Sequence, residues 1–168
     1  MTRLANGRDG IETYDGDVGW VRGANGRPRN MRSEELDTAK LEDPFFFAGQ
    51  LKEIVSNLRV QRVEKVGGRE AYVVFGRTQA LPQVRLYFDR ESGMLVRLIH
   101  YTDTAVGRYP TQIDYADFRT LDGVKVPFRW TIAEIRGRRY TYQMDDVQEN
   151  IPIEDSRFAK PSAPVASR

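Results

Sequence analysis

Residues 83–103, QVRLYFDRESGMLVRLIHYTD, decide the fold, because two runs of alternating apolar and polar residues flank a short polar turn. Alternation with a period of two is the signature of a strand with one buried face. The residues expected on that face are Val84, Leu86 and Phe88 in the first run and Met94, Val96 and Leu98 in the second. Gly93 stands where a turn of this length needs a positive φ, and Asp89 and Ser92 can bond the turn backbone. The segment is therefore predicted to be a β-hairpin.

Similar runs occur on both sides of the hairpin, which predicts a longer antiparallel meander, since an isolated two-stranded ribbon would be only marginally stable. The other strands are expected over residues 11–14, 18–22, 58–66, 69–77, 112–119, 124–135 and 139–147. In the last two, the residues expected to point toward the concave face are Val124, Val126, Phe128, Trp130, Ile132, Tyr140, Tyr142 and Met144. The pattern alone predicts a curved antiparallel sheet with helices on one side.

Two short helices are expected before the main sheet. Ser33 is a suitable N-cap for a first helix that ends near Lys40. Asp43 and Pro44 suit the cap and the first position of a second helix. That helix would be about 13 residues and roughly 20 Å long, enough to cross several strands.

Three consecutive phenylalanines, Phe45, Phe46 and Phe47, begin the second helix. Successive helical residues point about 100° apart, so the three cannot all face one sheet. Either protein surrounds this helix on two sides, or part of its aromatic surface lines a cavity for a lipid or another ligand. At least one of the three is predicted to be partly exposed, or to contact a ligand or a second copy of the chain.

Composition fits a soluble globular protein and argues against several functions. The 168 residues are 40% hydrophobic and carry a net charge of +2 with both signs interspersed, so no basic stripe for nucleic acid is expected. The absence of cysteine excludes disulfides, thiolate metal sites and C-x-x-C-H haem attachment. No apolar run is long enough for a membrane span, and residues 1–10 carry no secretion signal. We therefore expect either a cytoplasmic protein as written or a fragment whose leader lies upstream.

No catalytic centre, metal site or cofactor is predicted from the residues. His100 is the only histidine and has no cysteine or second histidine to act with, which favours a structural or surface role. The pairs Asp15 with Asp17 and Asp145 with Asp146 fit turn and strand-end chemistry better than metal binding or acid–base work. Motifs for nucleophilic hydrolysis, phosphate loops and dinucleotides are absent.

Three stretches together carry a family resemblance: LYFDRESGMLVRL, IDYADFRTLDGVKVPFRWTI and VQENIPIEDSRFAKP. Over residues 14–161 the chain resembles the LolA/LolB-like superfamily of outer-membrane lipoprotein-sorting and carrier proteins. In particular, it resembles a domain appended to acidobacterial multihaem cytochromes of the photosynthetic reaction-centre type. The resemblance implies an α+β fold: an incomplete half-barrel of curved antiparallel sheet, with two short helices packed on the concave face. It also implies an apolar cavity for acyl chains and a location in the periplasm or cell envelope.

The resemblance sets the expected domain organisation. The resemblance implies that such a domain usually begins with a helix and several strands before the segment that matches Tyr14, and we expect these elements to be missing here. We therefore expect one domain over residues 1–160 that lacks its N-terminal elements, followed by a disordered tail over residues 161–168. The missing elements would leave a sheet edge uncovered, which favours self-association or a partner that completes the sheet.

Two functions are left open. The first is a non-enzymatic lipid- or lipoprotein-binding carrier-like module, with an acyl chain or lipoprotein as its partner. Its expected cavity residues are Phe46, Phe47, Leu51, Phe88, Leu98, Phe128, Trp130, Tyr140 and Tyr142. The second is an assembly or docking domain for a multihaem electron-transfer cytochrome, in which the apolar face is only core. An enzyme is a distant third.

Overall fold

The structure is a computed structural model that describes residues 2–3, 9–23, 26–105, 107–134, 137–148, 151–154, 156 and 158–161. The chain divides into two compact units, which are described separately. We call Met1–Lys40 with Gln148–Arg168 the terminal unit and Leu41–Val147 the sheet unit. Apart from Pro161, the tail expected to be disordered lies outside the described residues.

The terminal unit contains four short antiparallel strands in the order β1-β2-β3-β4. They are β1 (Thr2–Arg3), β2 (Asp9–Tyr14), β3 (Gly19–Arg22) and β4 (Arg29–Asn30). A carboxylate oxygen of Asp15 accepts bonds from the amides of Asp17 and Val18 at 3.0 and 2.9 Å, which closes the turn between β2 and β3. This confirms the expected turn role of Asp15. The indole of Trp20 donates to the carbonyl of Phe158 at 2.8 Å, which ties the C-terminal segment to β3.

Helix α1 (Ser33–Glu42) begins at Ser33, the residue that was expected to be its N-cap. The amide of Leu36 donates to the carbonyl of Arg32 at 3.0 Å, so Arg32 and not Ser33 occupies the N-cap. Glu35 reaches back and accepts from the Arg32 amide at 2.8 Å. This is the return half of a capping box, which satisfies a helix-end donor that would otherwise lack a partner.

Helix α2 (Pro44–Ile54) starts as the sequence predicted. Asp43 caps it by accepting from the Phe45 amide at 2.8 Å. The backbone of Gln50 leaves the helical region at φ −122° and ψ 18°, so α2 is kinked there. It ends about three residues before the expected end.

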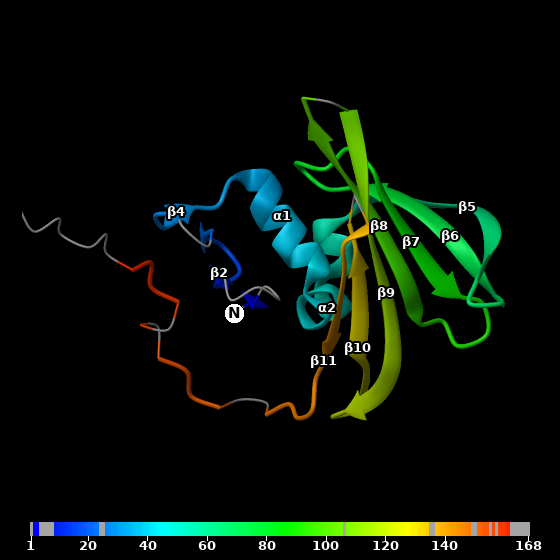
Figure 1. Ribbon diagram of the computed structural model, residues 1–168. Helices are drawn as coiled ribbons and strands as arrows, with labels where there is room; N and C mark the ends of the chain where they lie inside the picture. The colour runs from blue at the N-terminus through cyan, green and yellow to red at the C-terminus, as the bar shows by residue number, and fades with distance from the viewer. Residues whose placement is uncertain are drawn as a thin grey trace, which may run out of the picture. The chain divides into compact units, whose positions relative to one another are not determined.

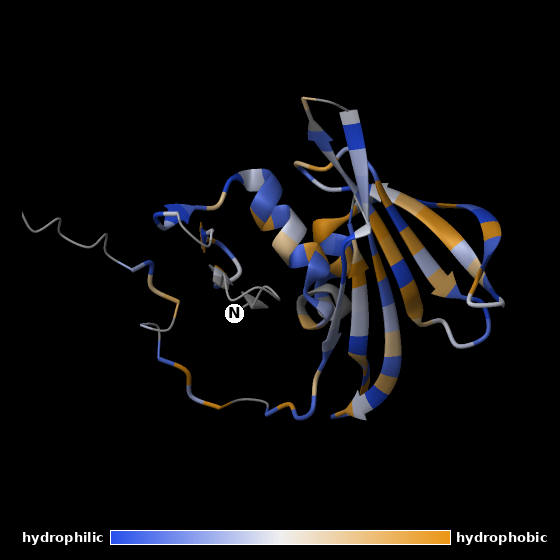
Figure 2. Ribbon diagram, in the orientation of Figure 1, coloured by the Kyte–Doolittle hydropathy of each residue, from blue (hydrophilic) through white to orange (hydrophobic). Residues whose placement is uncertain are grey.

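The sheet unit is built on seven strands that follow one another in chain order. They are β5 (Ser56–Val66), β6 (Arg69–Arg77), β7 (Val84–Asp89), β8 (Leu95–Thr104), β9 (Gly107–Leu121), β10 (Val124–Ala133) and β11 (Arg139–Gln143). All neighbouring strands are antiparallel, and β5 and β11 are the edges of an open sheet. Figure 1 shows the sheet curving, with α2 against one face. Apolar and polar residues alternate along its strands in Figure 2.

The central hairpin and its turn are confirmed. The amide of Asp89 donates to the carbonyl of Met94 at 2.8 Å, which closes the loop between β7 and β8. A carboxylate oxygen of Asp89 accepts from the Ser92 amide at 2.8 Å and from its hydroxyl at 2.7 Å. Gly93 has a φ of 71°, a conformation that costs glycine little. These bonds lower the pKa of the Asp89 carboxyl, with Ser92 as the largest cause.

The main core lies between α2 and one face of the sheet, which we call the inner face. Its buried residues are Leu41, Val55, Leu81, Val84, Leu86, Leu98, Ile113, Tyr115 and Ile132, and Leu51 and Ile54 of α2 pack against them. A smaller cluster of Ala71, Val73 and Tyr87 covers part of the opposite, outer face. There the guanidinium of Arg85 lies 5.1 Å from the ring centre of Phe75 and 5.3 Å from that of Tyr101.

Candidate ligand-binding pocket

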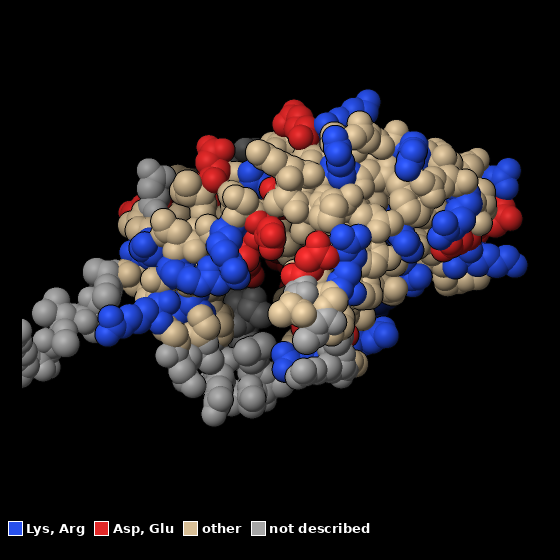
Figure 3. Space-filling model, turned by 90° about the horizontal axis from the view of Figure 1, so that it is seen from above, with Lys and Arg blue, Asp and Glu red and all other residues tan. Residues whose placement is uncertain are grey.

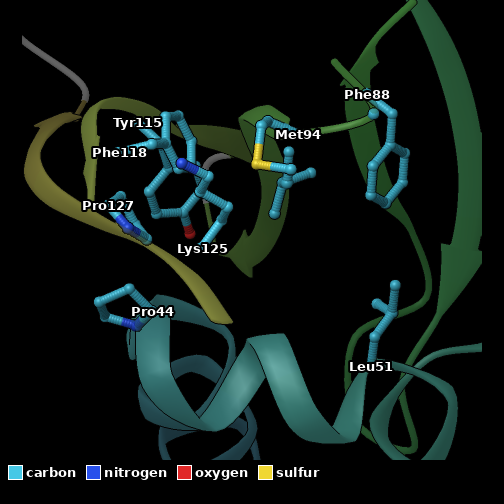
Figure 4. A pocket seen from close by; sticks show the side chains of 10 residues that line it. Pro44, Leu51, Phe88, Met94, Tyr115, Phe118, Lys125 and Pro127 are labelled. Carbon is cyan, nitrogen blue, oxygen red and sulfur yellow. The ribbon is translucent and has the colours of Figure 1, made fainter. Parts of the chain in front are cut away.

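A pocket with a volume of about 180 Å³ lies between α2 and the inner face of strands β7 to β10. Figure 4 shows its side chains pointing toward one another from the sheet and the helix. Its lining is formed by Pro44, Leu51, Phe88, Gly93, Met94, Leu95, Tyr115, Phe118, Lys125 and Pro127. Most of these residues are apolar, and the exposure of Gly93 and Lys125 indicates where the pocket meets solvent.

A β-bulge in β8 helps to form this pocket. Tyr87 pairs with Arg97 and Phe88 pairs with Leu95, so Val96 is an extra residue without a partner in register. A bulge places two residues against one and shifts the alternation of the strand. Leu95 therefore packs with the inner core while Val96 joins the outer cluster. The expectation that Met94, Val96 and Leu98 share one face is corrected here.

Strands β9 and β10 both change the set of positions that faces inward, near Asp117. Asp117 has a φ of 52°, in the left-handed region that Asp tolerates better than most residues. On β10, Lys125 and Pro127 line the pocket, whereas Trp130 and Ile132 pack with the inner core. On β10, the odd-numbered residues therefore face inward before Phe128 and the even-numbered residues face inward after it.

The change of face alters the interpretation of Phe128. Its side chain is 4% exposed, and the guanidinium of Arg119 lies 4.3 Å from its ring centre. Phe128 belongs neither to the pocket lining nor to the inner core. The expected alignment of Val124, Val126, Phe128, Trp130 and Ile132 on one face therefore does not hold along the whole strand. The interruption lies beside Asp117 of β9, whose backbone is left-handed.

The structure brings only part of the predicted cavity set together. Leu51 and Phe88 line the pocket. Leu98 is fully buried in the inner core, and Trp130 stacks on Tyr142 with ring centres 5.4 Å apart beside that core. Tyr140 of β11 is half-buried and pairs with Ile132 of β10. The side chains of Phe46 and Phe47 lie outside the described part of the structure, and Phe45 is 41% exposed, which confirms that one of the three is partly exposed.

Several pocket residues were not among those expected to line a cavity. They are Pro44, Met94, Leu95, Tyr115, Phe118, Lys125 and Pro127, together with Gly93. The alternation of Ile113 and Tyr115 on β9 is a signal that could have identified Tyr115 as inward-facing. Leu95, Phe118 and Pro127 depend on the two changes of face, and no pattern in the sequence marks those.

Tyr115 is the polar group of greatest interest in the pocket. Its side chain is 7% exposed, and its hydroxyl is buried without a hydrogen-bond partner among the described residues. Burial raises the pKa of this hydroxyl, and the carboxylates of Glu42 and Asp43 raise it further. Tyr115 therefore stays protonated and is available as a hydrogen-bond donor.

His100 and Glu42 form a polar contact outside the pocket lining. His100 is buried on β8, and its Nε2 lies 3.0 Å from a carboxylate oxygen of Glu42. Neither residue lines the pocket. Within the described ranges, no three His, Cys, Asp or Glu side chains are grouped to hold a metal ion, and no helix is both long and apolar enough to cross a membrane. Lys and Arg are spread among Asp and Glu on the face seen in Figure 3.

Comparison with known proteins identifies the fold. No protein-family model and no curated protein sequence matches the chain. Its structure is similar to an outer membrane lipoprotein-sorting protein domain from Vibrio parahaemolyticus, with a TM-score of 0.55 and 14% identity over 85% of this chain and 64% of that one. A LolA superfamily protein from Nitrosomonas europaea gives 0.53 and 15%, over 92% and 74%.

A DUF1329 family protein from Desulfovibrio piger is similar at a TM-score of 0.52 and 12% identity, over 84% of this chain and 62% of that one. The chain thus spans less than two thirds of the Vibrio and Desulfovibrio proteins. Identities this low establish shared architecture and not shared activity. The open, curved antiparallel sheet with its two short helices is therefore a LolA-like fold.

Proposed function

We propose that the sheet unit is a carrier-like binding module whose ligand is an acyl chain of a lipid or lipoprotein. The observation that carries the proposal is the apolar pocket between α2 and the inner face. Four of its apolar residues, Phe88, Met94, Leu95 and Phe118, remain only half-buried in the free protein. An acyl chain would cover them and gain about 25 cal/mol for each Å² of apolar surface removed from water.

The size of the pocket limits how much of a ligand it encloses. Its volume of about 180 Å³ is below the roughly 300–1,000 Å³ of pockets that surround a drug-sized molecule. The pocket therefore holds one segment of an acyl chain and not a whole lipid. The rest of the ligand extends past the exposed rim at Gly93 and Lys125.

Similarity of fold supports the same proposal. The Vibrio protein is described as an outer membrane lipoprotein-sorting domain and the Nitrosomonas protein as a LolA superfamily member. We extend to this chain the binding of a lipoprotein acyl group without catalysis, and a location in the periplasm or cell envelope. The pocket suits binding of an apolar group, since its described lining is apolar apart from Tyr115 and Lys125.

Two other partners rank below an acyl chain. Docking to a multihaem cytochrome rests on the sequence resemblance alone. Self-association through the edge strand β5 is opposed by the charges of Arg59, Arg62 and Lys65 and by the irregular pairing near Asn57. Charged side chains and bulges are the features by which natural sheets keep open edges from pairing.

A displacement assay tests the proposal. A fluorescent fatty acid is bound to the full chain and displaced by methyl decanoate. Met94→Glu places a charge in the apolar pocket and should abolish binding, because burying an unpaired carboxylate is costly. Val124→Glu makes the same change in charge at a site that is 53% exposed and does not line the pocket, so it serves as the matched control. Absence of binding to the wild type, or equal binding by both variants, would contradict the proposal.

A further inference from the structure

The hydroxyl of Tyr115 is a buried donor that the fold does not use. It has no hydrogen-bond partner among the described residues, although Tyr115 is only 7% exposed. Buried polar groups are nearly always paired, and an unpaired one costs folding free energy. Such a group within a pocket indicates that its partner arrives with a ligand.

The position of Tyr115 supports this interpretation. The residue lies on β9 and contributes to the pocket lining. Figure 4 shows its hydroxyl oxygen directed into the space between the strands and α2. Pro44, Leu51 and Pro127 supply an apolar lining around this space. An atom that bonds the hydroxyl there would be shielded from competing water, which strengthens the bond.

We infer that the pocket binds the carbonyl end of an acyl chain, with the Tyr115 hydroxyl donating a hydrogen bond to the acyl carbonyl oxygen. The inference rests on the proposed function and names the ligand group that the pocket recognises. The methylenes next to the carbonyl pack against Phe88, Met94 and Leu95. The remaining chain passes the rim beside Lys125.

A carbonyl oxygen fits this environment better than a charged group does. The lining is apolar, so an ion would lose its hydration without a full replacement. The carboxylates of Glu42 and Asp43 act on Tyr115, and they would repel an anion bound at its hydroxyl. Two sources present a carbonyl oxygen: the ester- or amide-linked acyl chain of a lipid, which is neutral, and the carboxyl group of a free fatty acid, which this environment disfavours in its ionised form.

The test compares ligands of similar length with and without a carbonyl. Methyl decanoate, decanoic acid and undecane are each titrated against the fluorescent fatty acid bound to the full wild-type chain and to the Tyr115→Phe variant. Tyr115→Phe should bind the carbonyl ligand roughly 3- to 10-fold more weakly than the wild type, as expected for one lost neutral hydrogen bond. Its affinity for undecane should equal that of the wild type. If the variant loses affinity for the ester alone, the ligand is a linked acyl chain. If it loses affinity for the acid, the ligand is a free fatty acid. Either result supports the inference.

A matched substitution controls for the loss of a buried hydroxyl. Tyr87 is 3% exposed on the outer face, and its hydroxyl interacts with Arg85 and Glu64. Tyr87→Phe should lower the urea midpoint of unfolding and leave all ligand affinities unchanged. Tyr115→Phe should show the opposite pattern, with a midpoint at or above that of the wild type, because it removes an unpaired group.

The outcomes separate this inference from the proposed function. If none of the three ligands displaces the probe from the wild type, the pocket does not bind acyl chains and both ideas fail. If all three ligands bind and Tyr115→Phe leaves their relative affinities unchanged, only the role of the hydroxyl is overturned. A Tyr115→Phe midpoint lowered as much as that of Tyr87→Phe, with unchanged affinities, would show that the hydroxyl is satisfied within the fold.

Discussion

Two buried aromatic side chains differ in their surroundings: Phe128 packs under the guanidinium of Arg119, whereas Tyr115 lines the pocket. Burial of Phe128 was predictable, since an aromatic residue in an alternating strand is seldom exposed. Its direction was not, because it depends on the left-handed backbone of Asp117 on the neighbouring strand. Tyr115 was within reach of the alternation on β9, whereas its unpaired hydroxyl could be recognised only from its surroundings.

Phe128→Ala should destabilise the protein without affecting the pocket. The side chain is buried under Arg119, so its truncation should cost about 3–5 kcal/mol in the free energy of unfolding. Urea denaturation of the variant measures this. A cost below about 1 kcal/mol would show that the ring is not packed. Under conditions in which the variant remains folded, its affinity for methyl decanoate should equal that of the wild type.

At the scale of elements, the hairpin, the meander and both helices were predictable because each is encoded locally. Turn residues such as Gly93 and caps such as Asp43 act within a few residues of their position in the sequence. The bulge at Val96 was not predictable, because it is a mismatch between two strands and leaves no mark in either one. The kink at Gln50 was missed for a similar reason: the surrounding residues continue the helical spacing.

The cap of α1 predicts an acid-sensitive element. Arg29 forms a two-pronged ion pair with Glu35 at 2.6 and 2.5 Å. Chiefly through that pair, and through the Arg32 amide, the pKa of Glu35 falls from its ordinary 4.5 to about 2. Since the folded pKa is depressed, the stabilisation is present above pH 4.5 and is lost as the pH falls toward 2.

Glu35→Gln should reduce this acid sensitivity. The amide cannot release a proton, so the free energy of unfolding should depend less steeply on pH between about 4.5 and 2 in the variant than in the wild type. Urea unfolding curves at a series of pH values measure the slope. Glu34→Gln, at an exposed neighbouring position, is the control. Equal slopes for Glu35→Gln and the wild type would contradict the role of the Arg29 pair.

The exposed phenylalanine of α2 gives another prediction. Phe45 is 41% exposed next to Pro44, which lines the pocket. Phe45→Ser should cost about 1–2 kcal/mol of stability, less than Phe128→Ala, because less buried surface is lost. If a bound acyl chain covers about 30 Å² of the ring, the affinity for methyl decanoate should fall roughly threefold. An unchanged affinity would remove Phe45 from the ligand site.

At the scale of the whole molecule, the sequence resemblance and the structure lead to the same LolA-like architecture. The division into a terminal unit and a sheet unit was not foreseen, since both are antiparallel and no linker composition separates them. The acyl-chain proposal belongs to the sheet unit alone, which contains every residue of the pocket.

Methyl NMR of the methionines tests the central claim most directly. The chain has four methionines, and Met94 lines the pocket whereas Met31 lies in the terminal unit. With the methionine methyl groups labelled with carbon-13 and the signals assigned by single Met→Leu substitutions, methyl decanoate is titrated into the full chain. An acyl chain in the pocket should shift the Met94 signal in a saturable way, give contacts between its methyl group and the ligand, and leave Met31 unchanged. A Met94 signal that does not respond at saturating ligand would contradict the account.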